Sequence, residues 1–174
     1  MIKNETLETL KTRRSCRAYK PEMITDEELE TVLEAGTWAP TGMGKQSPIL
    51  IAVQNPEDVA ELSRINAEIF GKPGFDPFYG AKTVIVVLAD AERPTRVEDG
   101  SLVLGNMMNA AASIGLGSCW IHRAKETFER EDGKALLKKW GITGNYIGVG
   151  NCILGYAAEP DKAPAPRKDN YITI

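Results

Sequence analysis

The chain has 174 residues, of which 43% are hydrophobic and 26% charged, with a net charge of −3 and a pI near 5.3. These values are typical of one soluble globular domain over residues 1–174, and the acidic balance disfavours nucleic-acid binding, which usually needs a basic excess. The first residues lack the apolar stretch of a signal peptide, and no apolar run reaches the roughly 20 residues of a membrane span. We therefore expect a cytoplasmic protein without a membrane partner.

The first half of the chain predicts two helices before any strand. Thr25 and Glu28 fit a capping box, in which the hydroxyl and the carboxylate satisfy free N–H groups of the first helical turn, and Pro40 ends that helical region. The other elements predicted from apolar periodicity and from Gly and Pro content are a helix over 4–14, a buried strand over 49–53, a helix over 56–70 and a loop over 71–80.

The second half predicts strands around one long helix. Residues 83–89 are apolar or β-branched throughout, which favours a strand. Residues 99–115 predict a nearly uncharged helix, typical of the centre of a fold or of a subunit interface. The remaining elements expected are strands over 118–121 and 146–154, an amphipathic helix over 125–140 and an extended tail over 159–174 that packs on another subunit. Because helices and strands do not alternate as strict βαβ units, we expect an α+β sandwich.

Cysteine and histidine usage limits the chemistry. Cys16, Cys119 and Cys152 are odd in number and widely spaced, and His122 is the only histidine. We therefore expect reduced thiols, without a disulfide framework or a metal site. A lone histidine is more often structural than catalytic, and Cys16 is better interpreted as a small buried side chain than as a reactive thiol. Neither a dinucleotide-binding glycine pattern nor a P-loop occurs at the required spacing.

Positive charge is concentrated near the N-terminus. Half of the residues from 11 to 20 are cations, although the chain is acidic overall: Lys11, Arg13, Arg14, Arg17 and Lys20. Arginine presents a fork of N–H donors that matches a phosphate, and Ser15 adds a hydroxyl. The same cations also suit a solvated helix C-terminus, where they oppose the negative end of the helix dipole. Spacing alone leaves both interpretations open.

Four segments, in order, carry a resemblance to a known family. They are Arg-Arg-Ser-Cys-Arg at 13–17, Ala-Pro-Thr-Gly-Met-Gly-Lys-Gln-Ser-Pro at 39–48, the run over 107–121 that ends Gly-Leu-Gly-Ser-Cys-Trp-Ile, and Ile-Leu-Gly-Tyr at 153–156 followed by Pro-Arg-Lys at 166–168. Together they resemble the FMN-dependent nitroreductase family. One such segment is weak evidence, but four in the family's order are specific.

The resemblance implies a fold and an activity. The fold is an α+β sandwich, with a central and mostly antiparallel sheet flanked by helices, in an intertwined homodimer that holds FMN at the subunit interface. The activity is electron transfer from NADH or NADPH through bound FMN to a nitroaromatic, a quinone or a related small acceptor, by a ping-pong mechanism. Because the isoalloxazine ring performs the hydride chemistry, no catalytic side chain is expected.

The implied FMN site draws residues from both subunits. Arg13 and Arg167, assisted by Lys168, match the phosphate-binding positions, and Arg17 matches a position beside the ring, which is anionic when reduced. Ser15 is implied to bind the ring or the ribityl chain. The other residues implied are Arg14 of the same basic segment, Pro40, Thr41 and Gly42 from the other subunit, and Ile121, His122 and Arg123, where the backbone N–H of His122 approaches flavin N5.

Some positions depart from the family pattern. Gly44 stands where many members have Asn, Ser47 stands where many have Pro, and His122 with Arg123 replaces a more usual small residue. These departures leave the acceptor open. The alternatives are a specialised relative that acts on one particular metabolite and a flavin-binding redox protein with little turnover.

Overall fold

In the computed structural model, which describes residues 2–160, 163–168 and 170–174, helices and strands interleave along the chain. The elements in order are α1 (Glu5–Thr12), α2 (Asp26–Thr37), the 3₁₀ turn η1 (Gly42–Gly44), β1 (Ile49–Val53), α3 (Pro56–Ile69), β2 (Thr83–Asp90), α4 (Arg96–Ser113), β3 (Gly117–Ile121), α5 (Ala124–Glu129), α6 (Glu131–Lys139) and β4 (Tyr146–Gly155). Every strand predicted from the sequence is present, within one residue at each end.

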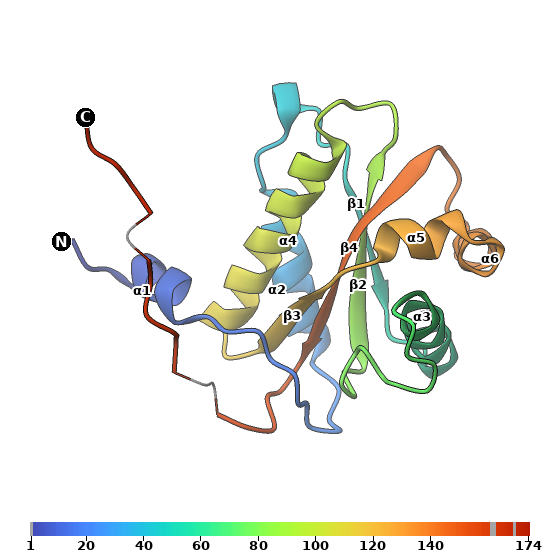
Figure 1. The fold of residues 1–174 in the computed structure, drawn as a ribbon, viewed down its shortest axis with the longest axis horizontal. Helices are drawn as coiled ribbons and strands as arrows, with labels where there is room; N and C mark the ends of the chain where they lie inside the picture. Colours follow the sequence, from blue (N-terminus) through green and yellow to red (C-terminus); the bar gives the residue numbers. More distant parts are fainter. Residues whose placement is uncertain (1, 161–162, 169) are drawn as a thin grey trace.

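The strands form one antiparallel sheet in the order β1-β2-β4-β3. The central strand β2 is buried from Thr83 to Ala89, which accounts for its continuous apolar sequence. Helices α2 and α4 cover one face of the sheet, and α3, α5 and α6 cover the other (Figure 1). The expected α+β sandwich with an antiparallel sheet is thereby confirmed, and β3 is left as an edge strand.

Each face of the sheet carries its own hydrophobic core. On one face, Leu104 and Met107 of α4 pack against the sheet with Val32 of α2. On the other face, Leu62 and Ile65 of α3 pack with Phe128 of α5. Burial of a side chain of this size contributes about 1.5–3 kcal/mol, so both layers are fixed firmly enough to hold functional residues in place.

The observed ends of the helices agree only in part with those predicted from the sequence. The predicted capping box is present: Glu28 N–H donates to Thr25 Oγ1 at 3.2 Å, and Thr25 N–H donates to the Glu28 carboxylate at 2.8 Å. The single helix predicted over 125–140 is wrong, because Arg130 adopts an extended conformation between α5 and α6. Gly133 lets α6 fold back onto α5, since a Cβ there would collide with the carbonyl of Thr127.

Both ends of the chain extend away from the sheet, on the side of the molecule where α1 lies (Figure 1). Helix α1 buries none of its residues, and Leu10 is half exposed. The described part of the tail over 159–174 forms no helix, and its last apolar side chains are fully exposed. Within the described residues, no helix is long and apolar enough to cross a membrane.

Candidate functional site

The basic segment 13–17 runs along the free edge of β3. Cys16 N–H donates to the Ser118 carbonyl at 2.9 Å, and Ser15 pairs with Ser118 as in a parallel sheet. Side chains therefore alternate: Cys16 is buried and its thiol donates to the Ala18 carbonyl at 3.2 Å, whereas Ser15 and Arg17 are exposed. The structural interpretation of Cys16 is confirmed, and Ser15 and Arg17 share the outward side of the segment.

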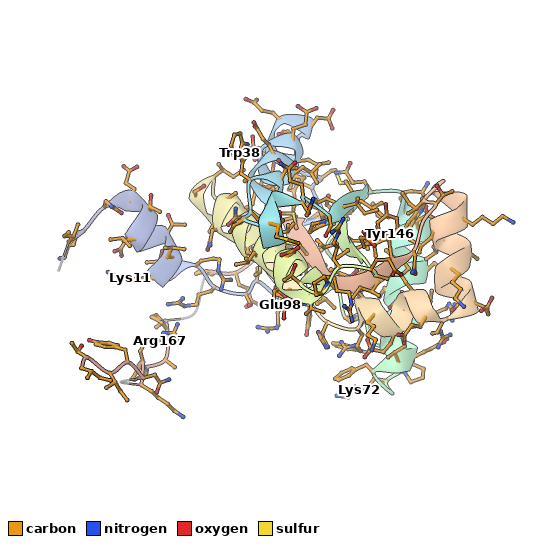
Figure 2. The ribbon with its side chains drawn as sticks, turned by 90° about the horizontal axis from the view of Figure 1, so that it is seen from above. Lys11, Trp38, Lys72, Glu98, Tyr146 and Arg167 are labelled. Carbon is orange, nitrogen blue, oxygen red and sulfur yellow. The ribbon has the colours of Figure 1, made fainter. Side chains whose placement is uncertain are left out.

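A cavity of about 460 Å³ lies between this segment and the C-terminal tail. Arg14, Ser15 and Arg17 line it from one side, and Arg167 lines it from the tail, together with Glu159. Figure 2 shows Arg167 beside α1, on the same side of the molecule as Lys11. The structure thus joins Arg17 and Arg167, which are 150 positions apart in the sequence, although neither Arg13, which the resemblance pairs with Arg167, nor the exposed Lys168 lines this cavity.

Arg13 and Arg14 have separate environments. Arg14 donates to the carbonyls of Lys11 and Arg13, so part of its guanidinium caps the end of α1. Arg13 lines a neighbouring cavity of about 550 Å³, which it shares with Arg14 and Glu159. Its Nη1 is buried and has no hydrogen-bond partner among the described residues. A buried donor without a partner costs about 1–3 kcal/mol, which favours an anion as its missing partner.

The stretch Ile121–Arg123 ends β3 and is held by α3. Asn66, which is 1% exposed, donates from Nδ2 to the His122 carbonyl at 2.8 Å and accepts from Arg123 Nε at 3.0 Å. Arg123 adopts the left-handed conformation with φ of 76°, and His122 is exposed. Asn66 was not among the residues predicted for the site, although an amide next to Ile65 in an otherwise apolar stripe signals a buried hydrogen bond.

The segment Pro40–Gly42 lies at the other end of α4. Gly42 N–H donates to Asp99 Oδ1 at 2.9 Å, and Thr95 Oγ1 donates to Asp99 Oδ2 at 3.0 Å, so the buried Asp99 ties this segment to the first turn of α4. Helix α4 has 18 residues and spans about 27 Å, and segment 13–17 lies near its far end (Figure 1). One chain therefore does not bring Pro40, Thr41 and Gly42 to the basic segment.

The outward face of α4 is unusually open. Leu102 and Val97 are about half exposed, at 47% and 50%. Gly105 faces empty space, with nothing within 4 Å of the position of a Cβ. The helix predicted to be apolar on most sides thus buries one side against the sheet and leaves another uncovered.

The chain thus has an antiparallel sheet between two helical layers and an arginine-rich segment along the edge strand β3. The chain belongs to the nitroreductase family, whose family model matches residues 10–156. A protein of Archaeoglobus fulgidus, provisionally named as an NADH dehydrogenase/NAD(P)H nitroreductase, is 32% identical over 96% of this chain and 90% of its own length.

Solved structures agree with this assignment. A nitroreductase from Bacteroides fragilis, crystallised with bound FMN, is 31% identical and superposes with a TM-score of 0.90 over 99% of both chains. A nitroreductase with bound FMN from Desulfitobacterium hafniense is 26% identical and also has a TM-score of 0.90, over 99% of this chain and 100% of its own. The resemblance stated from the four sequence segments is confirmed.

Proposed function

We propose that this protein is an FMN-dependent oxidoreductase that transfers electrons from NADH or NADPH to a nitroaromatic, a quinone or a related small acceptor. The observation that carries this proposal is the set of arginines along the edge of β3, which form no ion pair with a described residue, in a chain whose relatives of the same fold bind FMN. We further propose that it acts as a homodimer in the cytoplasm, where its three buried free cysteines would stay reduced.

The phosphate of FMN fits the cavity between the basic segment and the tail. Arg14, Ser15 and Arg167 line this cavity, and Arg17 lies beside them. None of these arginines forms an ion pair within the described residues, so their charge is available to a phosphate. Arg13 offers the buried Nη1 that lacks a partner, and Lys168 follows Arg167 on the tail. We assign Arg17 to the ring end, where a cation stabilises the anionic reduced form.

The ring of FMN fits the far end of β3. The register places Ser118 beside Ser15, and four residues further along an extended strand, roughly 13 Å away, lies His122. Asn66 holds the carbonyl of His122, so the neighbouring backbone N–H groups keep a fixed direction. A backbone donor at this place acts whatever the side chain is, which explains how His122 and Arg123 replace smaller residues.

The second subunit would complete this site. Pro40, Thr41 and Gly42 lie at the opposite end of α4 from the basic segment, so they reach a flavin only if they come from another copy of the chain. The open face of α4 offers a surface for that copy, because a two-fold axis across this helix would pair its two ends. The exposed apolar side chains of the tail, which include Tyr171 and Ile172, would be buried against the second subunit.

The division of labour is that of a cofactor enzyme. FMN, when bound, supplies the hydride chemistry, and the protein binds, orients and tunes it. The arginines fix the phosphate and favour the reduced ring, the clamped turn at His122 orients the ring edge, and the partner's segment would exclude water. No acid–base pair is needed among the side chains of this site.

Purification and assay of the whole protein test the proposal. It should be yellow, release FMN on denaturation, and oxidise NADH or NADPH in the presence of a nitroaromatic or a quinone. A protein that takes up no FMN overturns the proposal outright. Bound FMN without turnover of either acceptor would leave the flavin-binding redox protein as the better description.

A further inference from the structure

Arg123, at the end of β3, is held in place by neutral groups of the described chain. Arg123 Nε donates to the neutral amide of Asn66 at 3.0 Å, and the guanidinium lies over the ring of Phe70, 4.4 Å from its centroid. The neighbouring Lys125 pairs with Glu129 instead. Among the described residues, no carboxylate pairs with Arg123.

This arrangement leaves the useful edge of the guanidinium free. An arginine binds a carboxylate with two parallel N–H donors, and the end that carries Nη1 and Nη2 is one such pair. Within the part of the chain that the structure describes, Arg123 donates a hydrogen bond only from Nε, and the amide of Asn66 and the face of Phe70 fix the plane of the group. The Arg123 side chain is therefore held in one conformation before any ligand binds, which lowers the entropy cost of binding an anion.

Aromatic rings and a second cation extend this cluster outward. Phe70 is 43% exposed, and Lys72 Nζ lies 5.0 Å from its ring centroid. Phe75, which is 40% exposed, follows at a centroid distance of 6.3 Å. Lys72 lies at the rim of the molecule in Figure 2. An exposed aromatic surface between two cations suits a flat ligand that carries a negative group.

We propose that Arg123, with Phe70 and Lys72, binds the negative group of the electron acceptor and selects aromatic carboxylates over neutral aromatics of the same shape. This inference rests on the proposed function, in which the backbone at His122 and Arg123 borders the flavin ring. The cluster of Arg123, Phe70 and Lys72 continues from that backbone towards solvent. An acceptor stacked on the flavin ring therefore directs its carboxylate to the guanidinium of Arg123. Asn66 is a positioning residue, because it acts only through Arg123 and the His122 carbonyl.

A matched pair of acceptors tests the selection. The FMN-loaded dimer should reduce 4-nitrobenzoate with a kcat/KM roughly tenfold above that for 4-nitrobenzyl alcohol, the size expected for one charged hydrogen-bond pair at a partly exposed site. Arg123→Gln should bring the ratio close to one through a higher KM for the carboxylate. Lys125→Gln, which removes an exposed cation two residues away, should leave the ratio unchanged.

Binding measured without turnover separates this inference from the proposed function. Titration of the oxidised, FMN-loaded protein with benzoate and with benzamide, followed by the visible flavin absorbance, should show tighter binding of benzoate, and Arg123→Gln should abolish the difference. FMN content is read from the same spectra. A protein that keeps its FMN yet binds both ligands equally overturns the carboxylate site and leaves the oxidoreductase standing.

The 2′-phosphate of NADPH carries similar chemistry, so the electron donor forms a second arm of the test. If Arg123 serves the acceptor, Arg123→Gln changes kcat/KM for NADH and NADPH equally. A selective loss of NADPH use, with the carboxylate ratio unchanged, would assign Arg123 to the donor nucleotide and overturn the acceptor site. Lys72→Gln should reduce the carboxylate preference by a smaller factor, because its ammonium lies further from the turn.

Discussion

The side of the molecule formed by α3, α5 and α6 contains a network of internal ion pairs, with Arg123 and Lys72 outside it, whereas the arginines on the side formed by α1, α4 and the tail have no ion pair among the described residues. On the first side, Asp58 accepts from Lys139 and from Trp140, and Arg64 binds three carboxylates on two helices. On the second side, the arginines of segment 13–17 and Arg167 form no ion pair with a described residue, and α4 exposes Leu102.

This difference separates the charged groups that one chain pairs by itself from those that remain available to a cofactor or to a second subunit. Charged groups that are already paired with each other gain little from a further partner. A side with unpaired cations and an uncovered helix gains both from an anionic cofactor and from a second subunit. The predictions that follow compare the side formed by α3, α5 and α6, called the closed side, with the side formed by α1, α4 and the tail, called the open side.

The largest effect is expected at the open face of α4. Leu102→Glu would bury a charge on each side of a two-fold interface, and we expect at least a roughly 100-fold weaker dimer. Because segment 40–42 would come from the partner, FMN should be lost together with the dimer. Sedimentation and FMN content measure both. Ala135→Glu, which adds a carboxylate to an exposed position of α6, should change neither. A monomer of Leu102→Glu that retains FMN would contradict the shared site.

The next effect concerns folding on the closed side. Asp58→Ala removes the acceptor of Trp140 Nε1 and of Lys139, and leaves an indole donor without a partner. We expect a loss of about 1–3 kcal/mol in the free energy of unfolding, measured by urea denaturation of the FMN-free protein. The affinity for FMN should stay unchanged. Glu57→Ala, at the exposed neighbouring position, should cost less than 1 kcal/mol. Equal losses in both variants would mean that the buried pairing contributes nothing specific.

The sequence predicted the strands of the sheet better than the helix ends of the closed side. The strand over residues 83–89 was predicted correctly because a strand that is buried on both faces is apolar throughout and does not depend on an alternation of apolar and polar residues. The break between α5 and α6 was missed because it depends on Gly133 lying against the carbonyl of Thr127, a tertiary contact that leaves no periodic signal. The register between segment 13–17 and β3 is likewise a pairing between distant parts of the chain.

The candidate site was predictable where chemistry is concentrated in sequence. Five cations in ten residues marked the basic segment, and Arg167 followed from the family resemblance. The sequence did not reveal that Arg14 rather than Arg13 shares a cavity with Arg167, because this depends on Arg14 turning back to the carbonyls of Lys11 and Arg13, a local geometry that leaves no periodic signal. Asn66 was missed because its partners lie 56 and 57 positions away.

A smaller effect, with opposite consequences for binding and folding, is expected at Arg13. Arg13→Ala removes the unpartnered buried donor, so the FMN-free protein should unfold at the same or a slightly higher urea concentration. FMN should bind about tenfold more weakly, as expected for the loss of one charged hydrogen bond. Lys11→Ala, at an exposed position outside the site, is the matched control for charge. If Arg13→Ala lowers the free energy of unfolding but leaves the affinity for FMN unchanged, the role of Arg13 is purely structural.

The smallest effect is a difference in pH dependence between the two sides. On the closed side, the hydrogen bonds from Lys139 and Trp140 hold the pKa of Asp58 below its usual range, and Arg130 does the same for Asp132. A carboxyl whose folded pKa lies below its unfolded pKa contributes stability that is complete above the unfolded value, near 4, and is lost as the pH falls through the folded value. Folding should therefore weaken only below about pH 4.

FMN affinity should respond at a higher pH, because the arginines of the open side keep their charge while the phosphate does not. A phosphate monoester dianion takes up one proton near pH 6, so at pH 5 only about one-tenth remains doubly charged. If the arginines bind that form, FMN should bind up to about tenfold more weakly at pH 5 than at pH 7.5, while urea denaturation of the FMN-free protein is unchanged between these two values. A parallel decline of affinity and stability over this range would mean that the site loses FMN because the fold loosens, and the two sides would then not be independent.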